Sequence, residues 1–449
     1  MTLLTPLRQA LSEVPDTLRL AVPIIVGLSA AMLIGVVDTI MIAPLGTTAL
    51  AAVGLASAAL VILYSALYGL VSVVGIEIAR RYGTGRSDDV ASSLRNGTVL
   101  GLVAGSLAAV GMMVAFPLLR YLDQPPEVLP VLWPYWVTMA MVLIPFSMLY
   151  VFKGFYDAIG RPWVGAGFAM LSVLVNIPLN WLLIHGVGGW QGLGLMGAGI
   201  ASFLSECTAL LAAWAFWRYR NTMAEFRGAA AISIRDMSRQ LHDGGPIALA
   251  YTGEGASYSF VGIMLGWLGV VALAANQIVG SISTVIYMLP LGMSAAVGIR
   301  ISLAMGAGQV ERVRSIGIGA IAAVVVWMLF ITLLLIAFRD NIARGLSADP
   351  AVITVASTMF LSVALMQVFD GVQSTALGAL RGLMDNRAPS IISLIAYWPV
   401  ALPAAYLFGF VLDLGPSGIW IGYGIGLSVA AFALLFRFYR KSQLSSEDI

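Results

Sequence analysis

Long apolar runs separated by short polar segments fill the sequence from residue 18 to residue 436. Each run holds about 20 or more predominantly apolar residues, the length that a helix needs to cross a bilayer with its backbone groups bonded internally. The pattern therefore predicts twelve membrane-spanning helices and leaves no segment for a soluble domain. The predicted spans are 18–42, 49–76, 96–118, 131–152, 163–185, 194–217, 244–267, 272–299, 315–338, 352–380, 389–411 and 416–436.

Composition supports lipid as the solvent for most of this chain. Of 449 residues, 60% are hydrophobic and only 24 basic and 22 acidic residues are charged, about 10% against roughly 25% in globular proteins. One Cys and two distant His argue against a disulfide framework, a zinc site or a thiol catalyst. We therefore expect no enzyme, no cofactor and no nucleic-acid partner. The first 17 residues read as a retained cytoplasmic helix rather than a signal peptide.

The basic residues indicate the orientation, because positive charge near span ends tends to stay in the cytoplasm. With the N-terminus inside, 21 of the 24 basic residues fall on the cytoplasmic side, and only Arg120, Arg339 and Arg344 fall outside. A missed or extra span would scramble this distribution. We expect both termini to be cytoplasmic.

An internal duplication relates the two halves of the chain. Residues 23–85 match residues 246–308 at a constant offset of 223, with 18 of 63 positions identical and no gap. Each copy holds six spans, so both enter the membrane from the same side and form parallel lobes around a pseudo-two-fold axis. The expected fold is all-α, with an N-lobe at 1–217, a cytoplasmic connector at 218–243 and a C-lobe at 244–449.

Ionisable residues inside a membrane are costly, so the few present are candidates for function. Asp38 lies in the first span with no basic residue within one turn, and a carboxylate so placed can load and release a proton. Asn176 and Asn180 stand one turn apart around Pro178 on the fifth span and are its plausible partners. The alternative is a protonated Asp38 that only bonds a neighbouring helix.

Two further acids lie in the second copy. Glu254 shares a helix face with Tyr251, Ser257 and Tyr258, and Asp370 shares one with Gln367, Gln373 and Ser374. The repeat offset of 223 pairs Asp38 with Val261 and Glu254 with Ala31. The acids are therefore not duplicated, although the helices that carry them are. Glu206 remains open, because it either faces a cavity or makes a helix contact. Glu77, near an interface, is explained by an ion pair with Arg80 or Arg81.

The chain resembles the multidrug and toxic compound extrusion (MATE) transporters, in particular their NorM-like bacterial branch. The resemblance runs from about residue 15 to residue 440 and depends on the order and spacing of several motifs. These are Val37-Asp-Thr-Ile-Met41 with Leu45-Gly46, Asn176-Ile-Pro-Leu-Asn180, Ala274-Ala-Asn-Gln277, Pro290-Leu-Gly-Met-Ser-Ala-Ala-Val-Gly-Ile-Arg300, and Asp370-Gly-Val-Gln373 leading to Gly378-Ala-Leu-Arg381-Gly382.

The resemblance implies a monomeric antiporter of the bacterial inner membrane, surrounded by lipid. It would expel amphipathic, mainly cationic organic compounds in exchange for inward H⁺ or Na⁺, by alternating access. Candidate cation- and substrate-binding residues are Asp38, Asn176, Asn180, Glu254, Asp370, Tyr251, Tyr258 and Gln277. A sodium ion would bind at Asp38, Asn176 and Asn180, or at Glu254 and Asp370. Met366 stands where some members have a tyrosine facing the ion, which favours protons or the N-lobe site.

Three other functions compete with this one. A lipid-linked precursor flippase of similar architecture would need a more cationic cavity for anionic head groups than these buried acids provide. A membrane-embedded enzyme lacks a clustered catalytic motif. A passive channel has no need of a duplicated two-lobe frame, which favours a carrier.

Overall fold

The computed structural model describes residues 4–122, 127–228 and 231–443, and every regular element among them is helical. Eleven α-helices are long, and a further segment combines short α-helical and π-helical stretches into one rod. The long α-helices are α1 (Leu4–Ile42), α2 (Thr47–Gly83), α3 (Ser87–Ala115), α4 (Val128–Ala158), α5 (Pro162–His185), α6 (Leu195–Tyr219), α7 (Ile234–Trp267), α8 (Val270–Gly306), α9 (Val310–Leu346), α10 (Pro350–Gly382) and α13 (Gly415–Lys441). The composite rod contains α11 (Arg387–Ile395), η4 (Ala396–Ala401), α12 (Leu402–Tyr406) and η5 (Leu407–Val411); short 3₁₀ turns are η1 (Ala43–Leu45), η2 (Phe116–Leu122) and η3 (Asn221–Arg227).

The predicted all-α, polytopic fold is confirmed. Eleven of the rods in the described part of the chain are long and apolar enough to cross a membrane, with Arg387–Val411 counted as one. The twelfth, α7, falls outside this set because its first half is polar and its second half carries Glu254. Together they account for the twelve predicted spans.

The helices form two compact units, which are described separately. Unit 1 contains Met1–Ile25 and Leu249–Ile449, and unit 2 contains Val26–Ala248. The boundaries fall inside α1 and α7, so each of these helices begins in one unit and ends in the other. This partition differs from the repeat-based division, which assigned residues 1–25 to the N-lobe.

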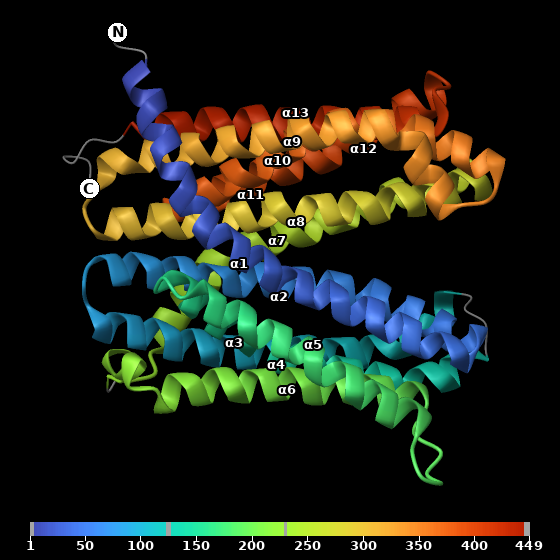
Figure 1. Ribbon diagram of the computed structural model, residues 1–449, viewed down its shortest axis with the longest axis horizontal. Helices are drawn as coiled ribbons and strands as arrows, with labels where there is room; N and C mark the ends of the chain where they lie inside the picture. Colours follow the sequence, from blue (N-terminus) through green and yellow to red (C-terminus); the bar gives the residue numbers. More distant parts are fainter. Residues whose placement is uncertain (1–3, 123–126, 229–230, 444–449) are drawn as a thin grey trace. The chain divides into compact units, whose positions relative to one another are not determined.

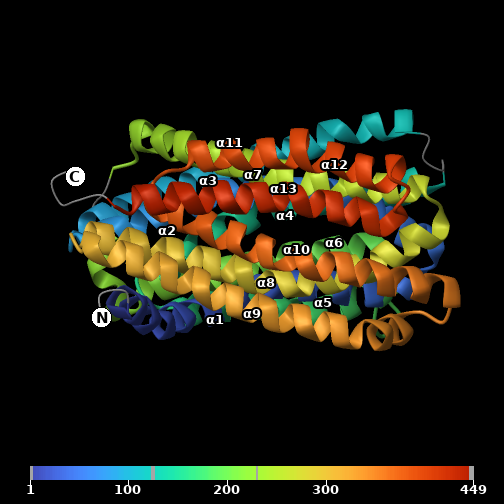
Figure 2. The ribbon, with the colours of Figure 1, turned by 90° about the horizontal axis from the view of Figure 1, so that it is seen from above.

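Each unit is built around one central helix. In unit 2, α4 packs against α2, α3, α5 and α6; in unit 1, α10 packs against α8, α9 and α13 (Figure 1). Figure 2 shows α8, α9, α10 and α13 running alongside one another from a second direction. The two central helices are the fourth spans of their respective repeat copies.

Shared glycines explain why the duplicated register persists in these packed helices. A Cβ at Gly75 on α2 would lie 3.2 Å from the Cα of Gly154 on α4. The repeat equivalent of Gly75 is Gly298 on α8, where a Cβ would lie 3.0 Å from the carbonyl oxygen of Gly378 on α10. A side chain at any of these positions would push apart two helices that touch through their backbones, so both copies need glycine there.

The turns between the first two spans of each copy also match. Gly46 and Gly269, which the offset of 223 pairs, have φ angles of 100° and 108°. A side chain is strained in this conformation, which glycine adopts readily. The turn that the two copies share sets the same entry into α2 and α8.

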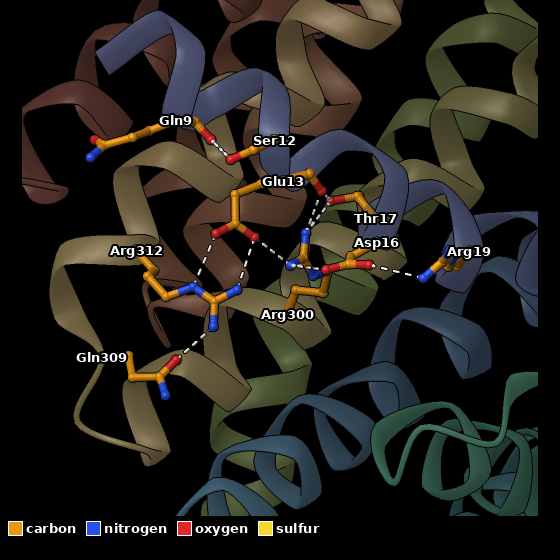
Figure 3. A network of polar contacts seen from close by, with 9 residues as sticks. All are labelled: Gln9, Ser12, Glu13, Asp16, Thr17, Arg19, Arg300, Gln309 and Arg312. Carbon is orange, nitrogen blue, oxygen red and sulfur yellow. Dashed lines mark hydrogen bonds and ion pairs between the residues drawn. The ribbon is translucent and has the colours of Figure 1, made fainter. Parts of the chain in front are cut away.

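A polar network joins the start of α1 to α8 and α9 within unit 1 (Figure 3). Arg300 donates to the carbonyl oxygen of Glu13 at 2.7 Å, to the hydroxyl of Thr17 at 2.6 Å and to the carboxylate of Glu13 at 2.5 Å. Asp16 lies 3.8 Å from the same guanidinium, and Arg312 holds both oxygens of Glu13 at 3.0 Å. We call the contacts of Arg300 with Glu13, Asp16 and Thr17 the Arg300 clasp.

Unit 2 holds an equivalent clasp with the charges reversed. Glu77 on α2 corresponds to Arg300, and it accepts from Arg239 at 2.7 Å and from Gln240 at 2.8 Å, at the start of α7. Arg239 and Gln240 in turn correspond to Asp16 and Thr17 at the same offset. Glu77 also pairs with Arg81 at 2.6 Å, which confirms an ion pair predicted for this residue. Each clasp fixes the beginning of a helix that continues into the other unit.

Candidate functional site

Asp38 is held by neutral donors in the interior of unit 2. The second half of α1 carries it, and its side chain is 5% exposed. Asn180 donates to one carboxylate oxygen at 2.5 Å, and Ser202 donates to the other at 3.1 Å. Within the described residues Asp38 forms no ion pair, and the side chains that bond its carboxylate are neutral.

The two asparagines of α5 lie against this carboxylate, as the spacing around Pro178 predicts. Asn180 donates to the side-chain oxygen of Asn176 at 2.9 Å, and Asn176 donates to the hydroxyl of Ser202 at 3.2 Å. Both amides are fully buried, and Oδ1 of Asn180 has no hydrogen-bond partner in the described part of the chain. The Asp38 carboxylate, both amide oxygens and the Ser202 hydroxyl are the kind of oxygen ligands that bind a hard cation.

Serines on α5 and α6 extend this network to Glu206. Ser205 donates to the carbonyl oxygen of Ser202 at 2.9 Å, and Ser172 donates to Glu206 at 3.1 Å with its hydroxyl 3.5 Å from that of Ser205. These serines are not among the residues predicted from the sequence. The signal was present, because Ser172, Asn176 and Asn180 recur at every fourth position and thus share one helix face.

In unit 1 the structure brings Glu254 and Asp370 together. The hydroxyl of Tyr287 on α8 donates to Glu254 at 3.2 Å, and Asp370, which is buried on α10, lies within electrostatic range of Glu254. Tyr287 corresponds to Tyr64 of the first copy, which lies within electrostatic range of Glu206 and, more weakly, of Asp38. The matching tyrosines thus face unmatched acids.

A π-helical segment places Tyr397 beside the same acids. Tyr397 lies in η4, where the wider helical turn follows α11, and its hydroxyl accepts from Gln373 at 2.6 Å and bonds to Glu254. Such π-helical turns occur frequently at functional sites because they redirect a side chain without breaking the helix. No pattern in the sequence singles out Tyr397.

Arg381 is a buried cation that sequence analysis placed at the cytoplasmic end of its span. Its side chain is 4% exposed, donates to the hydroxyl of Tyr251 at 2.8 Å and lies over the Tyr251 ring at 4.6 Å. It is also within electrostatic range of Glu254. The Glu254 carboxylate therefore has a resident positive charge nearby, which Asp38 lacks among the described residues.

The remaining predicted residues are less closely associated with these acids. Tyr258 packs its ring 5.5 Å from that of Trp420 and lies within electrostatic range of Asp370. Gln277 is exposed on α8, and its role stays a prediction. Met366 is buried and packs against Gly424 on α13.

The helices and the buried acids define a multi-pass membrane protein with polar groups in the interior of each helical unit. The MatE family pattern matches residues 23–182 and again residues 246–407, at the offset of the internal repeat. The matches cover well over half of the sequence. The chain belongs to the MATE family of multidrug efflux transporters, as its motifs indicated, and not to an enzyme family.

Similar proteins come from several bacteria. The multidrug resistance protein MdtK of Yersinia pseudotuberculosis is 30% identical over 378 residues, which cover 82% of this chain and 83% of that protein. The probable multidrug resistance protein NorM of Bradyrhizobium diazoefficiens is 30% identical over 440 residues, 96% and 94% of the two chains. The bent form of the Vibrio cholerae MATE transporter VcmN shares the fold, with a TM-score of 0.87 at 20% identity over 97% of this chain and 98% of that one.

Proposed function

We propose that this protein is a cation-coupled antiporter of the bacterial inner membrane that exports amphipathic, mainly cationic organic compounds. Inward H⁺ or Na⁺ would drive export by alternating access, with both termini in the cytoplasm and the protein acting as a monomer. The repeat copies 1–217 and 244–449 would act as the two lobes, joined by the connector 218–243. Membership of an efflux family does not favour the flippase alternative.

The observation that carries this proposal is that the Asp38 carboxylate is buried and bonded by neutral donors. A buried carboxylate with only neutral donors attracts any cation that reaches it, whether a proton, a sodium ion or an organic ammonium group. Two such cations cannot both neutralise one carboxylate. Loading of the coupling ion from outside therefore weakens retention of the drug, and loading of the drug from inside displaces the ion.

The membrane potential would add to this exchange, at about 2.3 kcal/mol per elementary charge per 100 mV. Glu254 and Asp370 would supply a second place where a cation binds in unit 1. Because the positive charge of Arg381 lies near Glu254, this second site attracts an external cation less strongly than Asp38 does. We therefore assign the principal competition between drug and ion to the site in unit 2.

Transport by the purified protein in sealed proteoliposomes tests the proposal. An imposed pH gradient and an imposed sodium gradient are applied separately, and movement of a fluorescent lipophilic cation is followed. We expect at least one gradient to drive movement against the concentration of the probe. If neither gradient drives movement of the probe, the antiporter assignment is wrong.

Asp38→Asn and a matched control identify the site. The variant keeps the shape of the side chain but removes its charge, and we expect gradient-driven movement to fall at least tenfold. Asp340→Asn removes a carboxylate that is 55% exposed and should retain transport. Equal transport by Asp38→Asn and Asp340→Asn would exclude Asp38 as the site of competition.

A further inference from the structure

Glu206 lies one helical turn after Ser202 on α6, among oxygen atoms of α5 and α6. Its Oε1 accepts from Ser172 at 3.1 Å, and the hydroxyl of Ser172 lies 3.5 Å from that of Ser205. Ser205 in turn donates to the carbonyl oxygen of Ser202 at 2.9 Å. The group therefore contains a carboxylate, two hydroxyls and a backbone carbonyl, drawn from α5 and α6.

The carboxylate of Glu206 is incompletely compensated. Its Oε2 is inaccessible to solvent and has no hydrogen-bond partner in the part of the chain that the structure describes, and no ion pair there includes this residue. A carboxylate offers about four lone-pair directions, and one neutral donor serves only one of them. An interhelical hydrogen bond could be made by a serine or glutamine, so it does not explain a carboxylate in this place.

The kinds of atoms around Glu206 indicate which partner would compensate its charge. The hydrogen-bonded atoms named around Glu206 are all oxygens, whereas two asparagine amides donate within the Asp38 network. The titratable side chains within electrostatic range of Glu206 are Tyr64, Tyr150 and Cys207, and none of them is a cation. Carboxylate, hydroxyl and carbonyl oxygens are suited to a hard cation, and a sodium ion or a proton would compensate the charge. We propose that Glu206, Ser172, Ser205 and the carbonyl of Ser202 form a second monovalent-cation site in unit 2, separate from Asp38.

Ser202 connects the two sites without merging them. Its hydroxyl serves Asp38 at 3.1 Å and its carbonyl serves Ser205, so a cation bound on one side changes the ligand geometry on the other. In an antiporter, which is the function proposed above, a second cation carried inward per cycle would add a driving force. At 100 mV each additional charge would raise the limiting drug ratio by about 50-fold.

Equilibrium binding to the purified full-length protein tests the second site directly. Radioactive sodium binding is measured at saturation, and proton uptake is measured by potentiometric titration between pH 9 and pH 5.5. The variants are Glu206→Gln, Asp38→Asn and their combination, and Glu225→Gln is the control because it removes an exposed carboxylate from η3.

A sodium site predicts that Glu206→Gln binds one sodium ion fewer than the wild type. A proton site predicts unchanged sodium binding and one proton fewer taken up over this pH range. Either loss should add to that of Asp38→Asn in the combined variant, while Glu225→Gln matches the wild type. Ser172→Ala removes the one hydrogen-bond donor to Glu206 found among the described residues. It should alter the apparent cation affinity about tenfold with the same monodisperse elution.

Two results would overturn the inference. Glu206→Gln could match the wild type in both measurements, or it could lose as many cations as the combined variant, which would mean one shared site. These outcomes are separate from failure of the proposed function, because that is judged by gradient-driven transport of the wild type. A wild type that binds the second cation but transports nothing would refute the antiporter and leave the site standing.

Discussion

Reversing the charge of Arg300 tests whether the Arg300 clasp secures α1 to unit 1. Arg300→Glu places a carboxylate next to Glu13 and Asp16 and removes three hydrogen bonds. Two of these go to neutral acceptors, worth about 0.5–1.5 kcal/mol each, and one to a carboxylate, worth about 1.5–3 kcal/mol. The side chains of Arg300 and Glu13 are 11% and 12% exposed, so solvent screens their interaction little. Since Arg312 still holds Glu13, we expect a loss of about 3–5 kcal/mol.

The equivalent clasp of Glu77 with Arg239 and Gln240 indicates how the stability lost in Arg300→Glu can be restored. There a carboxylate on the second helix of the copy accepts from Arg239, the equivalent of Asp16. Combining Arg300→Glu with Asp16→Arg copies that arrangement into unit 1. If the geometry of the clasp matters and its polarity does not, the double variant should recover most of the stability that the single variant loses.

Thermal unfolding of the full-length protein in detergent measures both variants. At about 2–4 °C per kcal/mol for a unit of this size, Arg300→Glu should lower the midpoint by about 6 °C or more. The double variant should lie within about 3 °C of the wild type. Arg86→Glu is the control for an equal change of charge, at a side chain that is 77% exposed, and it should have little effect. A double variant no more stable than Arg300→Glu, or an unaffected Arg300→Glu, would refute the reasoning.

Two further substitutions probe unit 1. Gly378→Ala should lower stability by about 1–3 kcal/mol, because its Cβ would overlap the carbonyl oxygen of Ser294. The control Gly345→Ala, whose Cβ would lie in open space on α9, should leave stability unchanged. Equal thermal midpoints for the two variants would contradict the close helix crossing. Arg381→Lys retains the charge but loses the planar contact with Tyr251, so we expect gradient-driven transport to fall about three- to tenfold; transport equal to wild type would show that charge alone suffices.

The sequence predicted those parts of the site in which a single residue stands out because its burial in an apolar span is energetically costly. Asp38 stands out because an acid in an apolar run needs a reason, and Asn176 and Asn180 stand out because their spacing gives them one face. Ser202 and Ser172 escaped notice because a hydroxyl in a membrane helix can bond its own backbone at little cost. Only the folded structure reveals that Ser172 of α5 serves Glu206 of α6 and that Ser202 of α6 serves Asp38 of α1.

Position along a span was a weaker guide than residue type. Arg381 lies in the last turn of α10, where a basic residue ordinarily faces the cytoplasm, yet the fold buries it against Tyr251. The Arg300 clasp joins residues 287 positions apart, a separation at which no local pattern exists. The repeat offset does relate the two clasps, but their reversed charges hide the relation from a comparison of identical residues.

The division of α1 between the two units has a consequence for biosynthesis. Ile25 is made early, but its unit also needs the chain from Leu249 onward. At about 5–20 residues per second, the ribosome takes roughly 10–45 s to make the intervening segment. During that interval the start of α1 has no finished partner, while unit 2 can already assemble. Truncated nascent chains ending before α8 should therefore leave Glu13 open to a membrane-impermeant carboxyl reagent, and full-length chains should protect it.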